Sequence, residues 1–205
     1  TVFSFHPVKI ITTGEGGAVL TNNKKYSEKI QMIRSHGITR DTSLMNQESH
    51  GFWYYQQIEL GYNYRMTDIQ AALGLSQIKR LDEFIEKRHQ IADIYYRELD
   101  SENLVLPYCL KESFSSFHLY IIKLKIPGRR KELIECMKKK GISANIHYIP
   151  IHMQPYYQAL GFKKGYLPNA EKYYEDAISI PIYPTLKNDQ QYEVINTINE
   201  SIKNL

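Results

Sequence analysis

The sequence has few cysteines, little proline and no long apolar run. Cys109 and Cys136 are too few for the disulfide framework of a small secreted domain, so we expect a reducing, cytoplasmic compartment. Only 11 glycines and 8 prolines occur in 205 residues, and 42% of the residues are hydrophobic, which excludes collagen-like and disordered chains. Apolar runs never reach the roughly 18 residues that a membrane-spanning helix needs, so we expect no membrane partner.

The excess of positively over negatively charged residues is also small. Lysine and arginine number 26 and aspartate and glutamate 22, which leaves a formal net charge of +4. Such a balance is far below the basic footprint of a nucleic-acid-binding domain. The basic run Lys138–Lys140 is predicted at the end of a helix, where lysines interact favourably with the helix dipole and stay solvated. We therefore expect no nucleic-acid partner.

The first third of the chain reads as short strands, one helix and a long loop. Residues 2–5 are β-prone, and the runs 10–13 and 18–21 predict a hairpin across a glycine-rich joint. A helix capped by Asn22 or Asn23 is predicted to extend to Ser35. The polar, aromatic loop that follows, including the tyrosine-rich stretch 51–57, either covers a site or packs an interface.

From Thr67 to about Leu99, apolar residues recur with a helical period. This segment is longer than most globular helices, so we expect it to bridge two substructures or to kink near Gly74. The remainder predicts an α+β domain, with strands at 104–106, 118–124, 144–148 and 178–180 and helices at 129–140, 169–177 and 188–204. Three regions are predicted. Residues 1–66 are part of a larger α/β domain, residues 67–100 are a connecting helix, and residues 101–205 are a small α+β domain.

Lys9 is the residue that most suggests chemistry. It lies between β-prone segments with no other charged side chain until Glu15. An amine in such a place is costly unless something uses it, and a lysine amine of lowered pKa acts as a nucleophile or forms a Schiff base. The Ser4 hydroxyl, five residues upstream, is able to donate to a phosphate, and the glycines beyond let the backbone approach a ligand.

Four segments together resemble one family. SFHPVKIITTGEGGAVLTN (4–22), LGYNYRMTDIQAALGLSQ (60–77), ANIHYIPIHMQPYY (144–157) and AISIPIYPTL (177–186) occur in the order typical of the DegT/DnrJ/StrS sugar aminotransferases. These enzymes use pyridoxal 5′-phosphate (PLP). The resemblance implies an α/β fold, that of fold-type-I PLP-dependent transferases, with the end of the large-domain sheet followed by a small α+β C-terminal domain.

The resemblance also implies roles for single residues. Lys9 would hold PLP as a Schiff base and move protons, and Ser4 would bind the cofactor phosphate. Asn63 would reach the phosphate of the neighbouring subunit's PLP, which implies a homodimer with a shared active site. Ser4 as a turn residue, and Asn63 as a residue in a left-handed turn, remain alternatives.

Three further residues are implied in substrate binding. Arg65 would support the anionic region of the site, and His147 and His152 would line the nucleotide-sugar pocket. The alternatives are a charge on a helix face for Arg65, and a satisfied histidine and a surface histidine for the other two. A metal site built from these histidines and a cysteine is not expected, because their spacing does not place two imidazoles on one helix face.

The expected function is transfer of an amino group from glutamate to C4 of a UDP-4-keto-6-deoxyhexose, as in the pseudaminic acid synthesis that supplies flagellin glycans. The segments SFHPVK and HYIPIHMQPYY indicate this subgroup. Another nucleotide, a 3-keto sugar, or a non-catalytic dimerisation or sensor role remains open. Family members carry a phosphate loop, a stacking aromatic ring and an aspartate upstream of the matched part, so we expect these 205 residues alone to be inactive.

Overall fold

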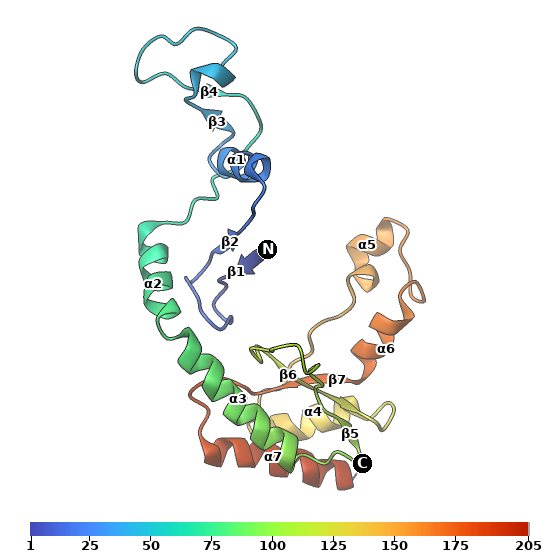
Figure 1. Cartoon of the computed structure of the whole chain (residues 1–205). Coiled ribbons are helices and arrows are strands. Elements are labelled where there is room, and N and C mark those ends of the chain that lie inside the picture. Colours follow the sequence, from blue (N-terminus) through green and yellow to red (C-terminus); the bar gives the residue numbers. More distant parts are fainter. Residues whose placement is uncertain (205) are drawn as a thin grey trace. The chain divides into compact units, whose positions relative to one another are not determined.

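The computed structural model describes residues 1–204, which form two compact units. Unit 1 runs from Thr1 to Leu81, and unit 2 begins at Asp82. Figure 1 shows the order of the elements along the chain. Within the described residues, no helix is both long and apolar enough to cross a membrane.

Unit 1 begins with a two-stranded antiparallel sheet. Strand β1 (Val2–Ser4) pairs with β2 (Gly17–Val19), with Val2 opposite Val19 and Ser4 opposite Gly17. The β-prone run at 2–5 is therefore confirmed, but the predicted pairing of 10–13 with 18–21 is wrong. Residues 10–13 form no strand and instead belong to the loop between β1 and β2, because the partner of the second strand lies further upstream.

Helix α1 (Lys24–Ile33) follows, and its N-cap is Asn23 rather than Asn22. The Asn23 side chain accepts hydrogen bonds from the backbone of Lys25 (3.0 Å) and Tyr26 (3.4 Å). These bonds satisfy two N–H groups of the first turn that have no partner in the helix. The long loop holds a short antiparallel pair, β3 (Ile38–Thr39) with β4 (Gln56–Gln57), and the 3₁₀ turn η1 (Thr42–Leu44).

The long helical segment is two helices. Helix α2 (Asp68–Ile78) starts with a reciprocal capping box between Thr67 and Gln70 and ends before Lys79. Helix α3 (Leu81–Glu98) then begins. The break therefore lies beyond Gly74, where the sequence suggested a kink, and that glycine sits in an uninterrupted stretch of α2.

Unit 2 contains a three-stranded antiparallel sheet and the core. The strand order is β5 (Leu104–Val105), β6 (Tyr120–Leu124) and β7 (Ala177–Ile180). Helices α4 (Arg130–Lys139) and α7 (Asn188–Lys203) lie side by side against it (Figure 1). The remaining elements are the 3₁₀ turn η2 (Ile151–Met153), α5 (Pro155–Ala159) and α6 (Pro168–Asp176).

Alternation along the strands explains which side chains build this core. Tyr120, Ile122 and Leu124 of β6 are buried, whereas the two residues between them are only partly buried. They pack with apolar side chains from α3, α4, β7 and α7 in one cluster. Burial of such side chains stabilises a fold by about 1.5–3 kcal/mol each, so unit 2 has a core of its own.

The strand predicted at 144–148 is wrong. In this segment only Asn145 pairs as in a sheet, through an isolated antiparallel bridge to Ser179 of β7. Its backbone N–H donates to the Ser179 carbonyl (3.0 Å) and its carbonyl accepts from the Ser179 N–H (2.8 Å). The chain then leaves the sheet and reaches η2, so the segment 144–153, here called the histidine segment, runs from an edge of the sheet into a loop.

Candidate cofactor and sugar sites

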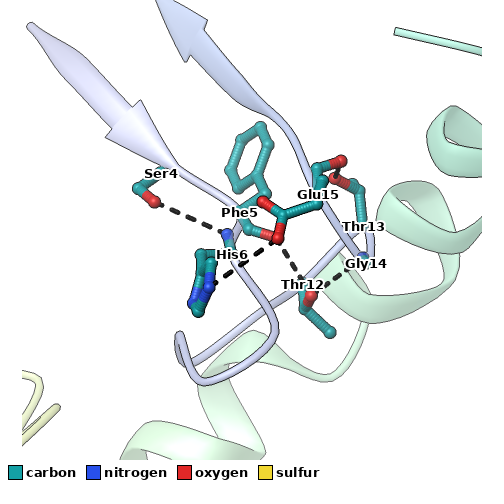
Figure 2. A network of polar contacts seen from close by, with 7 residues as sticks. All are labelled: Ser4, Phe5, His6, Thr12, Thr13, Gly14 and Glu15. Atoms are coloured by element: carbon teal, nitrogen blue, oxygen red, sulfur yellow. Dashed lines mark hydrogen bonds and ion pairs between the residues drawn. The ribbon is translucent and has the colours of Figure 1, made fainter.

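The loop at residues 5–16, here called the lysine loop, is braced by bonds across its base. The Phe5 N–H donates to the Gly16 carbonyl (2.8 Å), which extends the β1–β2 pairing by one step. The Phe5 carbonyl accepts from the Thr13 N–H (3.0 Å) and from the Thr12 hydroxyl (3.0 Å). Figure 2 shows these side chains gathered where the two arms of the loop approach each other.

Further bonds shape the glycine-rich arm. The Gly14 N–H donates to the Thr12 hydroxyl (2.9 Å), and the Thr13 hydroxyl donates to the Glu15 carbonyl (2.6 Å). Gly14 has a φ of 80°, in the left-handed region that a residue with a Cβ rarely adopts. The two threonines and this glycine therefore fix the return path of the loop.

Lys9 lies in the opposite arm, in a tight turn. Its backbone N–H donates to the His6 carbonyl (2.9 Å), and its side chain is partly buried. Within residues 1–204, no side chain or carbonyl pairs with the Lys9 amine. The nearest ionisable side chains of the loop lie beside each other, with His6 Nε2 3.7 Å from the Glu15 carboxylate. A braced loop thus presents one amine that is available to react.

The lysine loop also packs tightly against the start and middle of α2. A Cβ on Gly74 would lie 2.9 Å from the Thr13 methyl group, and one on Gly16 would lie 2.9 Å from the Met66 methyl group. Thr13 is 4% exposed. The close approach therefore requires glycine at position 74 and fixes the loop against the helix.

Ser4 ends β1 immediately before this loop. Its hydroxyl is exposed and accepts one long hydrogen bond from the His6 N–H (3.5 Å) (Figure 2). At that distance the bond is weak, and the hydroxyl proton remains available to an anion. A lysine amine suits the aldehyde of PLP and a serine hydroxyl suits its phosphate, so the donor types of Lys9 and Ser4 fit this cofactor.

Asn63 and Arg65 lie in the segment that leads into α2. The backbone of this segment is fastened to the end of α1, because the Tyr62 N–H donates to the Ile33 carbonyl (2.7 Å) and the Tyr64 N–H donates to the Arg34 carbonyl (2.9 Å). Both Asn63 and Arg65 are exposed. The fold thus holds their backbone and leaves their side chains accessible.

His147 belongs to unit 2 and is only half satisfied. Its Nδ1 lies 2.7 Å from the Ser179 hydroxyl, and its ring packs edge-on against Tyr148 at 4.6 Å between ring centroids. The ring is partly exposed. His147 therefore keeps one nitrogen, Nε2, for a ligand.

His152 is much more enclosed. Its side chain is 4% exposed, and Nε2 lies 2.8 Å from the Glu171 carboxylate, whose side chain is 9% exposed. The same carboxylate accepts from the Gly165 N–H (2.7 Å). The hydrogen bond from His152 lowers the pKa of Glu171, helped by backbone N–H groups and opposed by burial. This environment is that of a buried histidine with a carboxylate partner, so the alternative of a surface histidine at this position is wrong. Contact between His152 and a sugar stays a prediction.

The predicted residues therefore fall into groups. In unit 1, Ser4 ends β1 and Lys9 lies on the loop that follows it, whereas Asn63 and Arg65 lie in a separate segment. Unit 2 carries His147 and His152. Ser179 and Glu171, which contact the two histidines, were not singled out in the sequence because they lie 32 and 19 residues away and belong to no recognisable spacing.

Comparison with known proteins agrees with these features. Residues 1–199 match the DegT/DnrJ/EryC1/StrS aminotransferase family. The chain belongs to that family. The expected resemblance is thereby confirmed at family level, and it extends over almost the whole sequence.

Relatives and solved structures support the same assignment. The uncharacterized protein MJ1066 of Methanocaldococcus jannaschii is 44% identical over 98% of this chain and 53% of its own length. Helicobacter pylori PseC, an aminotransferase involved in pseudaminic acid biosynthesis, superposes with a TM-score of 0.87 at 34% identity, covering 100% of this chain and 53% of that one. The fold of fold-type-I transferases is therefore confirmed, and the chain spans about half the length of the relatives it matches.

A third match concerns the cofactor. The PLP form of the putative sugar aminotransferase Spr1654 from Streptococcus pneumoniae has a TM-score of 0.87 and 30% identity, covering 100% of this chain and 51% of that chain. The expectation of a PLP-dependent family is confirmed by this match together with the family assignment.

Proposed function

We propose that this protein works in a PLP-dependent aminotransferase that acts on a nucleotide-linked keto sugar. One observation carries the proposal: Lys9, whose amine has no partner within the described residues, lies on a loop that is braced at its base and packed on α2. Amines of this kind condense with aldehydes, with loss of water. Family membership supports the aminotransferase class, and the available amine supplies the group which that chemistry requires.

The residues divide the work between binding and proton movement. The Lys9 Nζ would bind the cofactor aldehyde, and once displaced by the amino donor it would carry a proton between the two carbons involved in transfer. The Ser4 hydroxyl would donate to the cofactor phosphate. When bound, PLP supplies the electron sink that lets a carbon next to the amine lose a proton.

A homodimer with a shared site is part of this proposal. Asn63 is exposed and held by its backbone, as expected of a residue that reaches a neighbour. Unit 1 also exposes large apolar side chains, including Phe52 (94%), Leu60 (84%) and Ile69 (84%). Apolar surfaces of this kind are typical of protein interfaces. Arg65, next to Asn63, would face the anionic groups.

For the substrate, we propose a UDP-4-keto-6-deoxyhexose, aminated at C4 with glutamate as donor, in a pathway to pseudaminic acid and flagellin glycans in the cytoplasm. The likeness to Helicobacter pylori PseC supports this choice. His147, and His152 through its remaining nitrogen, would contact the sugar or the diphosphate. Other nucleotide keto sugars are the competing substrates, to be compared directly in the assay.

The test is PLP binding by the wild type and two variants. Wild-type protein mixed with PLP should develop an absorbance band that borohydride abolishes. K9A should not develop it, and K25A, which removes an exposed lysine of the same unit, should behave as the wild type.

Two results would contradict the proposal. One is a band of equal strength in K9A, which would place the reactive amine elsewhere. The other is no band in the wild type together with a stable dimer, which would favour a non-catalytic dimerisation module.

A further inference from the structure

Ser179, a neighbour of His147, is buried and held by backbone hydrogen bonds. It is 6% exposed, lies opposite Ile121 of β6, and exchanges two backbone hydrogen bonds with Asn145 on its other side. Because Asn145 is only two residues before His147, the same contact fixes the base of the histidine ring. The Ser179 hydroxyl and the imidazole are therefore brought together by the backbone.

The direction of their hydrogen bond follows from what else the hydroxyl is able to reach. Ser179 Oγ lies 2.7 Å from His147 Nδ1, and within residues 1–204 the hydroxyl has no other partner. If Nδ1 carried the proton, the buried hydroxyl hydrogen would be left without an acceptor, which is costly. If the hydroxyl donates to Nδ1, both groups are satisfied.

We propose that Ser179 is a positioning residue that keeps neutral His147 in the tautomer with its proton on Nε2. His147 then presents an N–H donor to an oxygen of the bound substrate, either on the diphosphate or on the sugar. A histidine is an acceptor or a donor at each nitrogen according to its tautomer, so the serine decides which kind of ligand atom fits. This inference rests on the proposed function for the role of His147 and adds the residue that sets it.

The first test reads the tautomer directly. Nitrogen-15 NMR of the imidazole at about pH 8.5, where an ordinary imidazole is neutral, should show the His147 proton on Nε2 and Nδ1 as a hydrogen-bond acceptor. A proton on Nδ1 would overturn the proposal. The wild-type protein is sufficient for this measurement, so it does not depend on a variant that folds.

Three variants then separate positioning from general stability. S179A should shift the Nδ1 resonance towards that of a free imidazole, and S179T, which keeps a hydroxyl, should restore it. S201A is the matched control, because Ser201 is also a buried serine, hydrogen-bonded to the Thr197 carbonyl (2.6 Å) away from His147. An unchanged Nδ1 resonance in S179A, or an equal change in S201A, would contradict the assignment.

The last experiment tests whether Ser179 affects ligand binding, with UDP and UDP-glucose as probes. S179A should weaken binding about five-fold, the effect of one hydrogen bond, with S201A unchanged. A loss for both probes indicates a diphosphate contact, and a loss for UDP-glucose alone indicates a sugar contact. Equal affinities in S179A and the wild type, or no binding by the wild type, would overturn the substrate role. PLP is absent from these measurements, so their failure is distinguishable from failure at Lys9.

Discussion

His147 and His152 each have one ring nitrogen bonded within the described residues, but they differ in exposure. His152 is buried with Nε2 on Glu171, whereas His147 is partly exposed and uses only Nδ1. A buried side chain paired with a carboxylate contributes mainly to structure, whereas a free polar atom near the surface is available to a ligand. We therefore expect substitution of His147 to affect mainly substrate binding, with a smaller effect on the melting temperature.

The His152–Glu171 pair leads to a pH-dependent stability. The pKa of Glu171 is lowered from 4.5 in the folded protein, first by the hydrogen bond from His152. Its ionised form therefore adds stability at pH values above 4.5, and this contribution is lost as the pH falls through the lower folded pKa. We predict that E171Q is less stable than the wild type at neutral pH and that the difference shrinks in acid.

Thermal unfolding between about pH 3 and pH 7 measures this difference. E175Q is the matched control, since Glu175 lies on the same helix, α6, and is exposed. If the difference in thermal stability between E171Q and the wild type is constant across this pH range, the charge of the Glu171 carboxylate contributes nothing to stability.

Among the elements, α2 determines how the lysine loop is held. Thr13 cannot simply rotate away from a Cβ on Gly74, because its hydroxyl bonds to the Glu15 carbonyl and its side chain is buried. Alanine is more favourable than glycine in a helix by about 1 kcal/mol. G74A should therefore stabilise α2 and destabilise the lysine loop. We predict that G74A slows amide hydrogen exchange slightly in α2 and speeds it in the lysine loop.

Hydrogen exchange of the Thr13 N–H, which donates to the Phe5 carbonyl, measures the loop. It should be faster in G74A and return towards the wild-type rate in T13S/G74A, because serine keeps the hydroxyl and lacks the methyl group. Unchanged exchange at Thr13 in G74A would mean that the helix contact does not hold the loop.

The elements also show which features a single sequence carries. Helices α1, α4, α6 and α7 were predicted within a few residues, because their apolar period and their caps are local signals. The partner of β2 and the end of the sheet near Asn145 were predicted wrongly, because strand pairing depends on contacts between distant residues. Lys9 and Ser4 were recognisable from a motif, but Ser179 and Glu171 were not, since each acts through a contact that only the fold creates.

At the scale of the whole molecule, the apolar core belongs to unit 2. Every residue of the core cluster within the described chain lies between Ile91 and Ile202. The buried residues of unit 1 are Thr13, Gly37, Thr39 and Gln56, none of which is a large apolar side chain. Because apolar burial is the main source of folding free energy, the two units should differ in independent stability.

We predict that a fragment of residues 79–205 folds cooperatively and that a fragment of residues 1–81 does not. The longer fragment keeps the start of α3 and the whole core cluster. Urea unfolding followed by circular dichroism should give a single sigmoidal transition for it and a gradual change for the other. A cooperative transition in residues 1–81 would contradict this account of where stability arises.

The central claim, that Lys9 binds PLP covalently, is tested most directly by trapping the adduct and locating it. The protein is incubated with PLP, reduced with borohydride, digested and analysed by mass spectrometry. We predict a pyridoxyl-phosphate group on Lys9, in preference to exposed lysines such as Lys25, and its disappearance in K9R. Labelling spread over surface lysines with Lys9 unmodified would contradict the claim.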